Sequence, residues 1–110
     1  MRDLNRYIDH TILRADATRD DVRKLCGEAK EHRFYAVCVN TCYVALCSEL
    51  LAGTDVAIAA VVGFPLGAAH TAAKVAETRI AVAEGAADVD MVLAIRALKE
   101  GRQEYVREDI

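Results

Sequence analysis

The sequence has 110 residues, a formal net charge of −3, and 54% hydrophobic and 28% charged residues. These values are typical of one globular domain, which we expect to span residues 1–110, and the mild acidity argues against a nucleic-acid-binding function. No apolar run approaches the roughly 20 residues of a membrane span, and the N-terminal MRDLNRYIDH lacks the apolar core of a signal peptide, so we expect a cytoplasmic protein without membrane partners.

Strand and helix patterns alternate along the first half of the chain. Tyr7–Leu13 (YIDHTIL) is typical of a short strand, and Asp16-Ala17-Thr18 provides N-cap chemistry for a helix. The apolar face of that helix has spacings of three and four residues: Val22, Leu25, Cys26 and Ala29. Phe34–Val39 (FYAVCV) then predicts a second strand, and Val44–Leu51 a second helix.

The same alternation continues through the second half. Val56–Gly63 (VAIAAVVG) is apolar without interruption, as expected for a strand that is covered on both faces, and Phe64–Gly67 predicts a turn. A third helix is indicated by an apolar stripe: Ala72, Ala76, Ile80 and Ala83. Asp88–Ile95 (DVDMVLAI) predicts a fourth strand, and Gly101 precedes a last amphipathic helical segment, QEYVREDI.

Four strand-helix units in succession predict a parallel sheet with right-handed crossovers. Two architectures have this pattern: an open doubly wound sheet, and part of a (βα)8 barrel. The first predicted strand is not followed by G-x-G-x-x-G, which disfavours a dinucleotide-binding fold.

Sites in parallel α/β folds lie at the carboxyl ends of the strands, so polar residues there are the candidates for chemistry. These residues are Asp9, His10, Thr11, Cys38, Asn40, Asp88 and Asp90. Asp90 lies among apolar neighbours, deeper than Asp88 at the strand entrance. Its carboxylate is either satisfied by backbone N–H groups or an arginine, or desolvated with a raised pKa and ready for proton transfer.

For the other candidate residues, a structural role is a simpler explanation than a catalytic one. Asp9 could cap a turn, and His10 could be a satisfied core histidine instead of a general base. The four cysteines are expected to be free thiols in a reducing compartment. The spacing of Cys38, Cys42 and Cys47 only weakly suggests a metal site, and we predict none.

Three sets of motifs together carry a family resemblance: YIDHTIL at Tyr7–Leu13, YAVCVN at Tyr35–Asn40 with VGFPLG at Val62–Gly67, and EGAADVDMV at Glu84–Val92. In order and spacing they resemble the deoxyribose-phosphate aldolase family over about Leu4–Ile110. The resemblance implies the first four βα units of a TIM (β/α)8 barrel, that is, a half barrel with parallel strands.

The resemblance also implies a class I aldolase, a lyase that cleaves 2-deoxyribose 5-phosphate to glyceraldehyde 3-phosphate and acetaldehyde through a lysine Schiff base. Neither a metal nor another cofactor is implied. Asp90 matches the catalytic aspartate, which helps to move protons during imine chemistry. Thr11 and Leu13 match residues that line the substrate pocket, and Cys38 matches a small residue near the reacting carbonyl.

The sequence departs from the family in its length. Family members are expected to be about twice as long, at roughly 250 residues for such barrels. Their Schiff-base lysine lies on the sixth strand, a second lysine on the seventh, and their phosphate-binding residues in the last loops. None of these segments is present, and the lysines of this chain fall on predicted helices or after the fourth strand: Lys24, Lys30, Lys74 and Lys99.

We therefore expect this chain to be inactive alone, with a phosphosugar substrate only when complemented. Four strands cannot close a barrel, so bare edges favour a homo-oligomer or association with a missing C-terminal half. One alternative is a non-catalytic half-barrel module with a structural or assembly role. Another is an open-sheet phosphate binder that uses the turn Gly63–Gly67, although Pro65 removes a backbone donor there.

Overall fold

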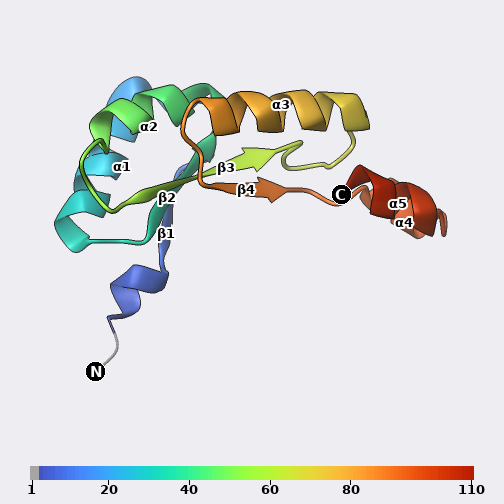
Figure 1. Ribbon diagram of the computed structural model, residues 1–110, viewed down its shortest axis with the longest axis horizontal. Helices are drawn as coiled ribbons and strands as arrows, with labels where there is room; N and C mark the ends of the chain where they lie inside the picture. The colour runs from blue at the N-terminus through green and yellow to red at the C-terminus, as the bar shows by residue number, and fades with distance from the viewer. Residues whose placement is uncertain (1–2) are drawn as a thin grey trace.

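The computed structural model describes residues 3–110 and contains one parallel sheet of four strands (Figure 1). The strands are β1 (Asp9–Thr11), β2 (Ala36–Asn40), β3 (Ala57–Val62) and β4 (Asp88–Met91). Their order in the sheet is β1-β2-β3-β4, so each strand pairs with its neighbours in the sequence. A doubly wound sheet reverses its strand order at a switch point, whereas a barrel keeps the sequence order. The order therefore favours the barrel.

Three helices cover a single face of this sheet: α1 (Arg19–His32), α2 (Val44–Leu50) and α3 (Thr71–Ala83) (Figure 1). The main core lies between these helices and the sheet, and its largest fully buried side chains are Val22, Val37, Val39, Val44, Cys26 and Cys47. Helices on one face only are the arrangement of a barrel wall. The doubly wound alternative is therefore excluded.

The opposite face of the sheet, here called the inner face, carries a smaller apolar cluster. Cys38, Ala59 and Val61 are buried there, and Leu13 packs against them. All residues of β3 after Ala57 are buried, which confirms the covering expected on both faces of this strand. In a closed barrel the inner face lines the interior, where side chains from all strands meet.

Several element boundaries differ from those predicted. Leu4–Tyr7 forms a short 3₁₀ helix, so β1 is shorter than the predicted strand. Thr41–Tyr43 is a second 3₁₀ turn. The fourth strand ends at Met91. Beyond it, one further ladder bond joins the Val92 N–H to the Val62 carbonyl at 3.2 Å.

Two helices follow β4 beyond the carboxyl end of the sheet: α4 (Ile95–Lys99), which the sequence did not predict, and α5 (Gln103–Asp109), which it did. They pack on each other through a third apolar cluster formed by Ala94, Ala97 and Val106. Ile95, the last residue of the predicted fourth strand, begins α4 instead.

The predicted core face of the third helix is wrong. The whole apolar stripe Ala72, Ala76, Ile80 and Ala83 is exposed, while Lys74 and Ala81 are the buried residues of α3. The helix packs on the sheet with a side that includes polar residues, because their charges and hydrogen-bonding groups find partners at the carboxyl ends of the strands. Across residues 3–110, no helix combines the length and apolarity that a bilayer span requires.

Candidate active site

The register of the strands places the predicted site residues in two lateral rows. Thr11, Cys38, Ala59 and Asp88 form the first row, and Asn40, Val61 and Asp90 form the second. Residues two apart on a strand share a face, so both rows lie on the inner face, away from the three helices. The sequence-predicted residues Thr11, Leu13, Cys38 and Asp90 thus share the inner face, with Thr11 and Asp90 on the two edge strands and Leu13 packed against Cys38.

The thiol of Cys38 reports the electrostatics of this face. Cys38 is 5% exposed, and burial raises the pKa of its thiol. The negative charges of Asp90 and Asp9 raise this pKa further, while a hydrogen bond with Thr11 opposes them. A thiol with a raised pKa stays protonated at neutral pH, so Cys38 provides a small neutral wall to the site.

Asp90 is exposed, and this corrects the expectation of a desolvated carboxylate. The exposure of β4 alternates, with Asp88 and Asp90 exposed and Val89 and Met91 half-buried. β4 is an edge of the sheet, and no further strand curves over the inner face of residues 3–110. The carboxylate of Asp90 therefore lies on an open face.

Two of the other polar candidates have structural partners. The hydroxyl of Tyr35 donates to Asp88 Oδ2 at 3.0 Å, and this hydrogen bond raises the pKa of the tyrosine. His10 lies on the helix side of the sheet, with Nε2 3.2 Å from Glu28 Oε1 and its ring 5.1 Å from that of Phe34. His10 is therefore a satisfied histidine beside α1 and not part of the inner-face site.

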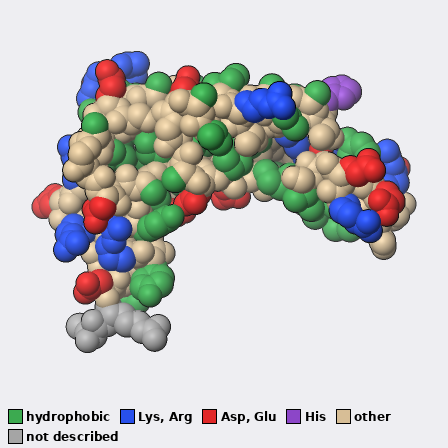
Figure 2. Space-filling model, viewed as in Figure 1, with side chains coloured by type: hydrophobic (Ala, Val, Ile, Leu, Met, Phe, Trp, Pro, Cys, Tyr) green, Lys and Arg blue, Asp and Glu red, His purple; other side chains and the backbone are tan. Residues whose placement is uncertain are grey.

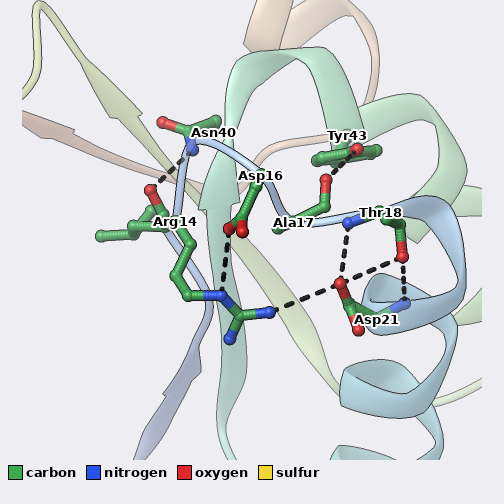
Figure 3. Close-up of polar contacts among 8 residues, drawn as sticks. Arg14, Asp16, Ala17, Thr18, Asp21, Asn40 and Tyr43 are labelled. Carbon is green, nitrogen blue, oxygen red and sulfur yellow. Dashed lines mark hydrogen bonds and ion pairs between the residues drawn. The ribbon is translucent and has the colours of Figure 1, made fainter.

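The loop that follows β1 is held in place by side chains from the next strand and helix (Figure 3). Asn40 Nδ2 donates to the Leu13 carbonyl at 3.4 Å, and the Tyr43 hydroxyl donates to the Ala17 carbonyl at 2.6 Å. Arg14 adds ion pairs with Asp16 and Asp21. The contact from Asn40 ties the segment that carries Leu13 to β2, the strand that carries Cys38.

The same loop runs into α1 through a capping box. The Asp21 N–H donates to Thr18 Oγ1 at 3.2 Å, and the Thr18 N–H donates to Asp21 Oδ2 at 2.8 Å. The backbone hydrogen bond from Thr18 lowers the pKa of Asp21, and the hydroxyl of Thr18 lowers it further. This reciprocal pair satisfies two otherwise unpaired groups at the helix start; the sequence predicted N-cap chemistry in Asp16-Ala17-Thr18 but not the pairing with Asp21.

A pocket of about 310 Å³ lies at the carboxyl ends of β2 and β3. It is lined by Asn40, Val61, Gly63, Phe64, Pro65, Leu66, Ala68, Ala69 and Glu77. Through Val61, which is in register with Asp90, the pocket adjoins the second inner-face row. It thus continues the site toward the turn that follows β3.

That turn does not provide a phosphate cradle. The Gly63 N–H donates to Glu77 Oε1 at 2.9 Å, and the Gly67 N–H donates to the Gly63 carbonyl at 2.7 Å. Two donors of the turn are therefore already used, and the carboxylate of Glu77 would repel an anion. These contacts argue against the open-sheet phosphate binder.

Sequence reasoning missed the polar side of α3. Lys74 is only 4% exposed, and its ammonium forms an ion pair with Asp109 of α5 and donates to the Val92 carbonyl at 3.0 Å. Glu77 accepts from Gly63 and, at 2.7 Å, from the Thr41 hydroxyl. The only sequence signal was a lysine and a glutamate three residues apart on one predicted helix.

In the described part of the chain, residues 3–110, no lysine lies on the inner face. Lys24, Lys30 and Lys99 are exposed on helices, and Lys74 is engaged by Asp109. The three cysteines considered as metal ligands do not share one site. Cys38 faces inward, Cys42 is exposed, and Cys47 is buried 3.7 Å from Cys26. Within residues 3–110, no three histidine, cysteine or acidic side chains are grouped to hold a metal ion.

We predict that the folded chain loses stability in acid, because the carboxylate of Asp109 is buried and ion-paired. Burial alone raises the pKa of this carboxyl, but hydrogen bonds from Lys74 and Thr71 outweigh burial and lower it below the ordinary value. A lowered folded-state pKa stabilises the protein above the unfolded-state pKa of about 3.9, and this contribution is lost as the pH falls through the folded-state value. We expect thermal melts below about pH 4 to show a steeper loss of stability for the native chain than for Asp109→Asn. Parallel acid profiles of the two chains would contradict this expectation.

Strands in sequence order, helices on one face and polar side chains at the carboxyl ends of the other face define the first half of a (βα)8 barrel. The sequence model of the DeoC/LacD family aldolases matches residues 4–110. The chain belongs to this family.

Individual relatives agree with this assignment. The deoxyribose-phosphate aldolase of Bdellovibrio bacteriovorus is 55% identical over 107 residues, which are 97% of this chain and 49% of the relative. The solved structure named QR15, an aldolase, superposes with a TM-score of 0.93 at 34% identity, covering 99% of this chain and 48% of that one. The tetrameric deoxyribose phosphate aldolase of Aeropyrum pernix superposes with a TM-score of 0.80 at 29% identity, covering 96% and 48%. The chain spans about half the length of the curated relatives it matches.

Proposed function

We propose that this chain provides the N-terminal half of a class I deoxyribose-phosphate aldolase, with Asp90 as its catalytic carboxylate. The observation that carries the proposal is the gathering of Asp90, Cys38, Thr11 and Leu13 on the inner face, at the carboxyl ends of the strands. The names of the relatives supply the substrate class, 2-deoxyribose 5-phosphate.

The division of roles follows from which groups are present. A lysine amine is needed to form the Schiff base, and the inner face described above contains none, so the nucleophile comes from a second set of βα units. Asp90 moves protons to and from the imine intermediates, directly or through water. Thr11, Leu13 and Cys38 form the wall against which the reacting carbonyl lies. The phosphate group is bound by the other half.

A chimera tests the proposal. This chain would replace the matching N-terminal half of the Bdellovibrio bacteriovorus aldolase, and retro-aldol cleavage of 2-deoxyribose 5-phosphate would be measured with borohydride trapping of the imine. We expect both signals from the chimera and neither from the isolated chain. Trapping on Lys24, Lys30, Lys74 or Lys99 would overturn our view of the nucleophile. A folded chimera without cleavage activity would overturn the proposed function.

A non-catalytic assembly module is the second candidate, because β1 and β4 are unpaired edges in residues 3–110. Figure 2 shows hydrophobic and acidic side chains on the hollowed side of the molecule. Exposed large apolar residues include Tyr7, Leu66 and Ile80, at 74%, 72% and 56%. Such a module would fold and associate like the first candidate but would give an inactive chimera.

Both candidates predict self-association of the isolated chain. Unpaired strand edges and exposed apolar side chains favour pairing with another copy, so we expect a dimer or a larger oligomer at micromolar concentration. Light scattering coupled to size exclusion measures the mass directly. A well-folded monomer under these conditions would show that the open edges are tolerated.

A further inference from the structure

The polar side of α3 contacts the carboxyl ends of three consecutive strands. Glu77 Oε2 accepts from the hydroxyl of Thr41, the residue after β2, and Glu77 Oε1 accepts from the N–H of Gly63, the residue after β3. Lys74 Nζ donates to the carbonyl of Val92, the residue after β4. Each strand is thus held at the first residue beyond its end.

These contacts are built into the packing. A Cβ at Gly63 would lie 3.2 Å from Lys74 Cε and 3.3 Å from its Cγ, so the lysine stem lies directly on the backbone of the turn. Gly63 also has φ +60°, a left-handed conformation that glycine adopts without strain. Asp109 and Thr71 complete the arrangement: Asp109 pairs with Lys74 and accepts from the Thr71 hydroxyl at 2.6 Å.

The strand ends held in this way carry the candidate site. On β4, Asp90 lies two residues before Val92. Asp90 is in register with Val61 of β3, which lies two residues before Gly63. The last ladder bond between these strands joins the Val92 N–H to the Val62 carbonyl. Lys74 and Glu77 are here called the clamp. The clamp therefore binds the backbone at the carboxyl end of the β3–β4 pair, next to Asp90.

We propose that Lys74 and Glu77 are positioning residues of the active site, which fix the ends of β2, β3 and β4 and thereby the place of the Asp90 carboxylate. Both side chains belong to α3, on the other side of the sheet from Asp90, and their polar atoms are used by the strand-end contacts, although Glu77 also lines the pocket beside the second row. The catalytic part of this inference rests on the proposed function, whereas the clamp itself does not. A displacement of about 1 Å in a reacting group lowers rates on the order of 100-fold, so the effect should be measurable.

The clamp is tested in the isolated chain by amide hydrogen exchange. Glu77→Ala should raise the exchange rates of the Gly63 and Val92 amides at least tenfold. The Ala57 amide, bonded to the Tyr35 carbonyl at the opposite end of β3, should keep its rate. Unchanged exchange at Val92 would show that Glu77 serves Gly63 alone. Equal acceleration at Ala57 would show a general loss of stability. Either result would overturn the proposal.

The catalytic consequence is tested in the chimera. Glu77→Ala should lower kcat about 10- to 100-fold with KM within twofold, because proton transfer is misaligned while phosphate binding is unaffected. Glu77→Gln keeps an acceptor for Gly63 and should restore most of kcat. The matched control is Ser48→Ala, which removes a side-chain hydrogen bond to the Glu84 carbonyl at the other end of α3 and should leave kcat unchanged.

Different failures remain distinguishable. An inactive unsubstituted chimera would reject the proposed function, and the exchange measurement would still decide the clamp. An active chimera that keeps its kcat in Glu77→Ala, or that loses it equally in Ser48→Ala, would reject the positioning role while leaving the proposed function intact. A second variant, Lys74→Met with Asp109→Leu, removes the bond to Val92 without leaving a buried charge. It should also lose kcat.

Discussion

Replacing Asp90 by asparagine is expected to lower kcat of the complemented enzyme by about 100- to 10,000-fold, the usual contribution of a general acid-base group. Asparagine has nearly the same shape but cannot carry the proton. Because Asp90 is exposed on an edge strand of the isolated chain, the substitution should hardly change the stability of that chain. The measurements are steady-state cleavage of deoxyribose 5-phosphate by the chimera and a thermal melt of the isolated chain.

Asp88→Asn is the matched control for this prediction. Asp88 lies two residues earlier on the same strand, has the same side chain and is also exposed, but it accepts a hydrogen bond from Tyr35. We expect Asp88→Asn to keep kcat within a few-fold of the unsubstituted chimera. If both variants lose activity equally, the effect comes from the charge of the strand and not from proton transfer at Asp90. If Asp90→Asn keeps full turnover, the assignment of the catalytic carboxylate is wrong.

The parallel sheet could be predicted because local patterns indicate it, whereas the choice of a barrel over a doubly wound sheet came from the family resemblance. The unbroken apolar run of β3 indicates a strand covered on both faces, and alternating strand and helix patterns indicate parallel crossovers. Period-two alternation correctly placed Asp88 and Asp90 on one face. The resemblance then placed Thr11, Leu13 and Cys38 near them, and the structure brings these residues together on the inner face.

The exposure of Asp90 was not predicted from its local sequence pattern. Apolar neighbours in the sequence suggested burial, but Val89 and Met91 point to the helix side of the sheet while Asp90 lies on the open side. A strand that is central in a complete barrel is an edge here. Sequence pattern reports which face a side chain occupies, but it does not report what covers that face.

The burial of Lys74 escaped prediction for a different reason. Alanine and isoleucine on α3 suggested the core stripe, and a lysine is almost never fully buried unless it is paired. Its partner, Asp109, is 35 residues away on a helix that packs beside it only in the folded chain. Such a pair has no local signature, so the buried side of α3 was assigned to the wrong residues.

This pair gives the largest expected effect on stability. Lys74→Met removes the ammonium and leaves the carboxylate of Asp109, 1% exposed, without its charge partner. Breaking a buried ion pair in this way costs about 3–5 kcal/mol, because the remaining charge is desolvated and uncompensated. We expect a loss of this size in the free energy of unfolding, measured by urea denaturation at fixed protein concentration. The exposed pair of Arg107 and Glu104 on α5 is the control, and Arg107→Met should cost less than about 1 kcal/mol.

Combining Lys74→Met with Asp109→Leu should recover most of the lost stability, since apolar residues of similar size often replace a buried ion pair without cost. The recovery separates two roles of the pair. If the double variant is stable but the chimera that contains it is slow, the charges are needed for the geometry at Val92 and not for folding. If Lys74→Met alone costs less than about 1 kcal/mol, water reaches Asp109 and the pair is not a buried one. The stability of the two variants, together with the kcat of the chimera that contains the double variant, would decide whether α3 holds the strand ends by charge or by packing alone.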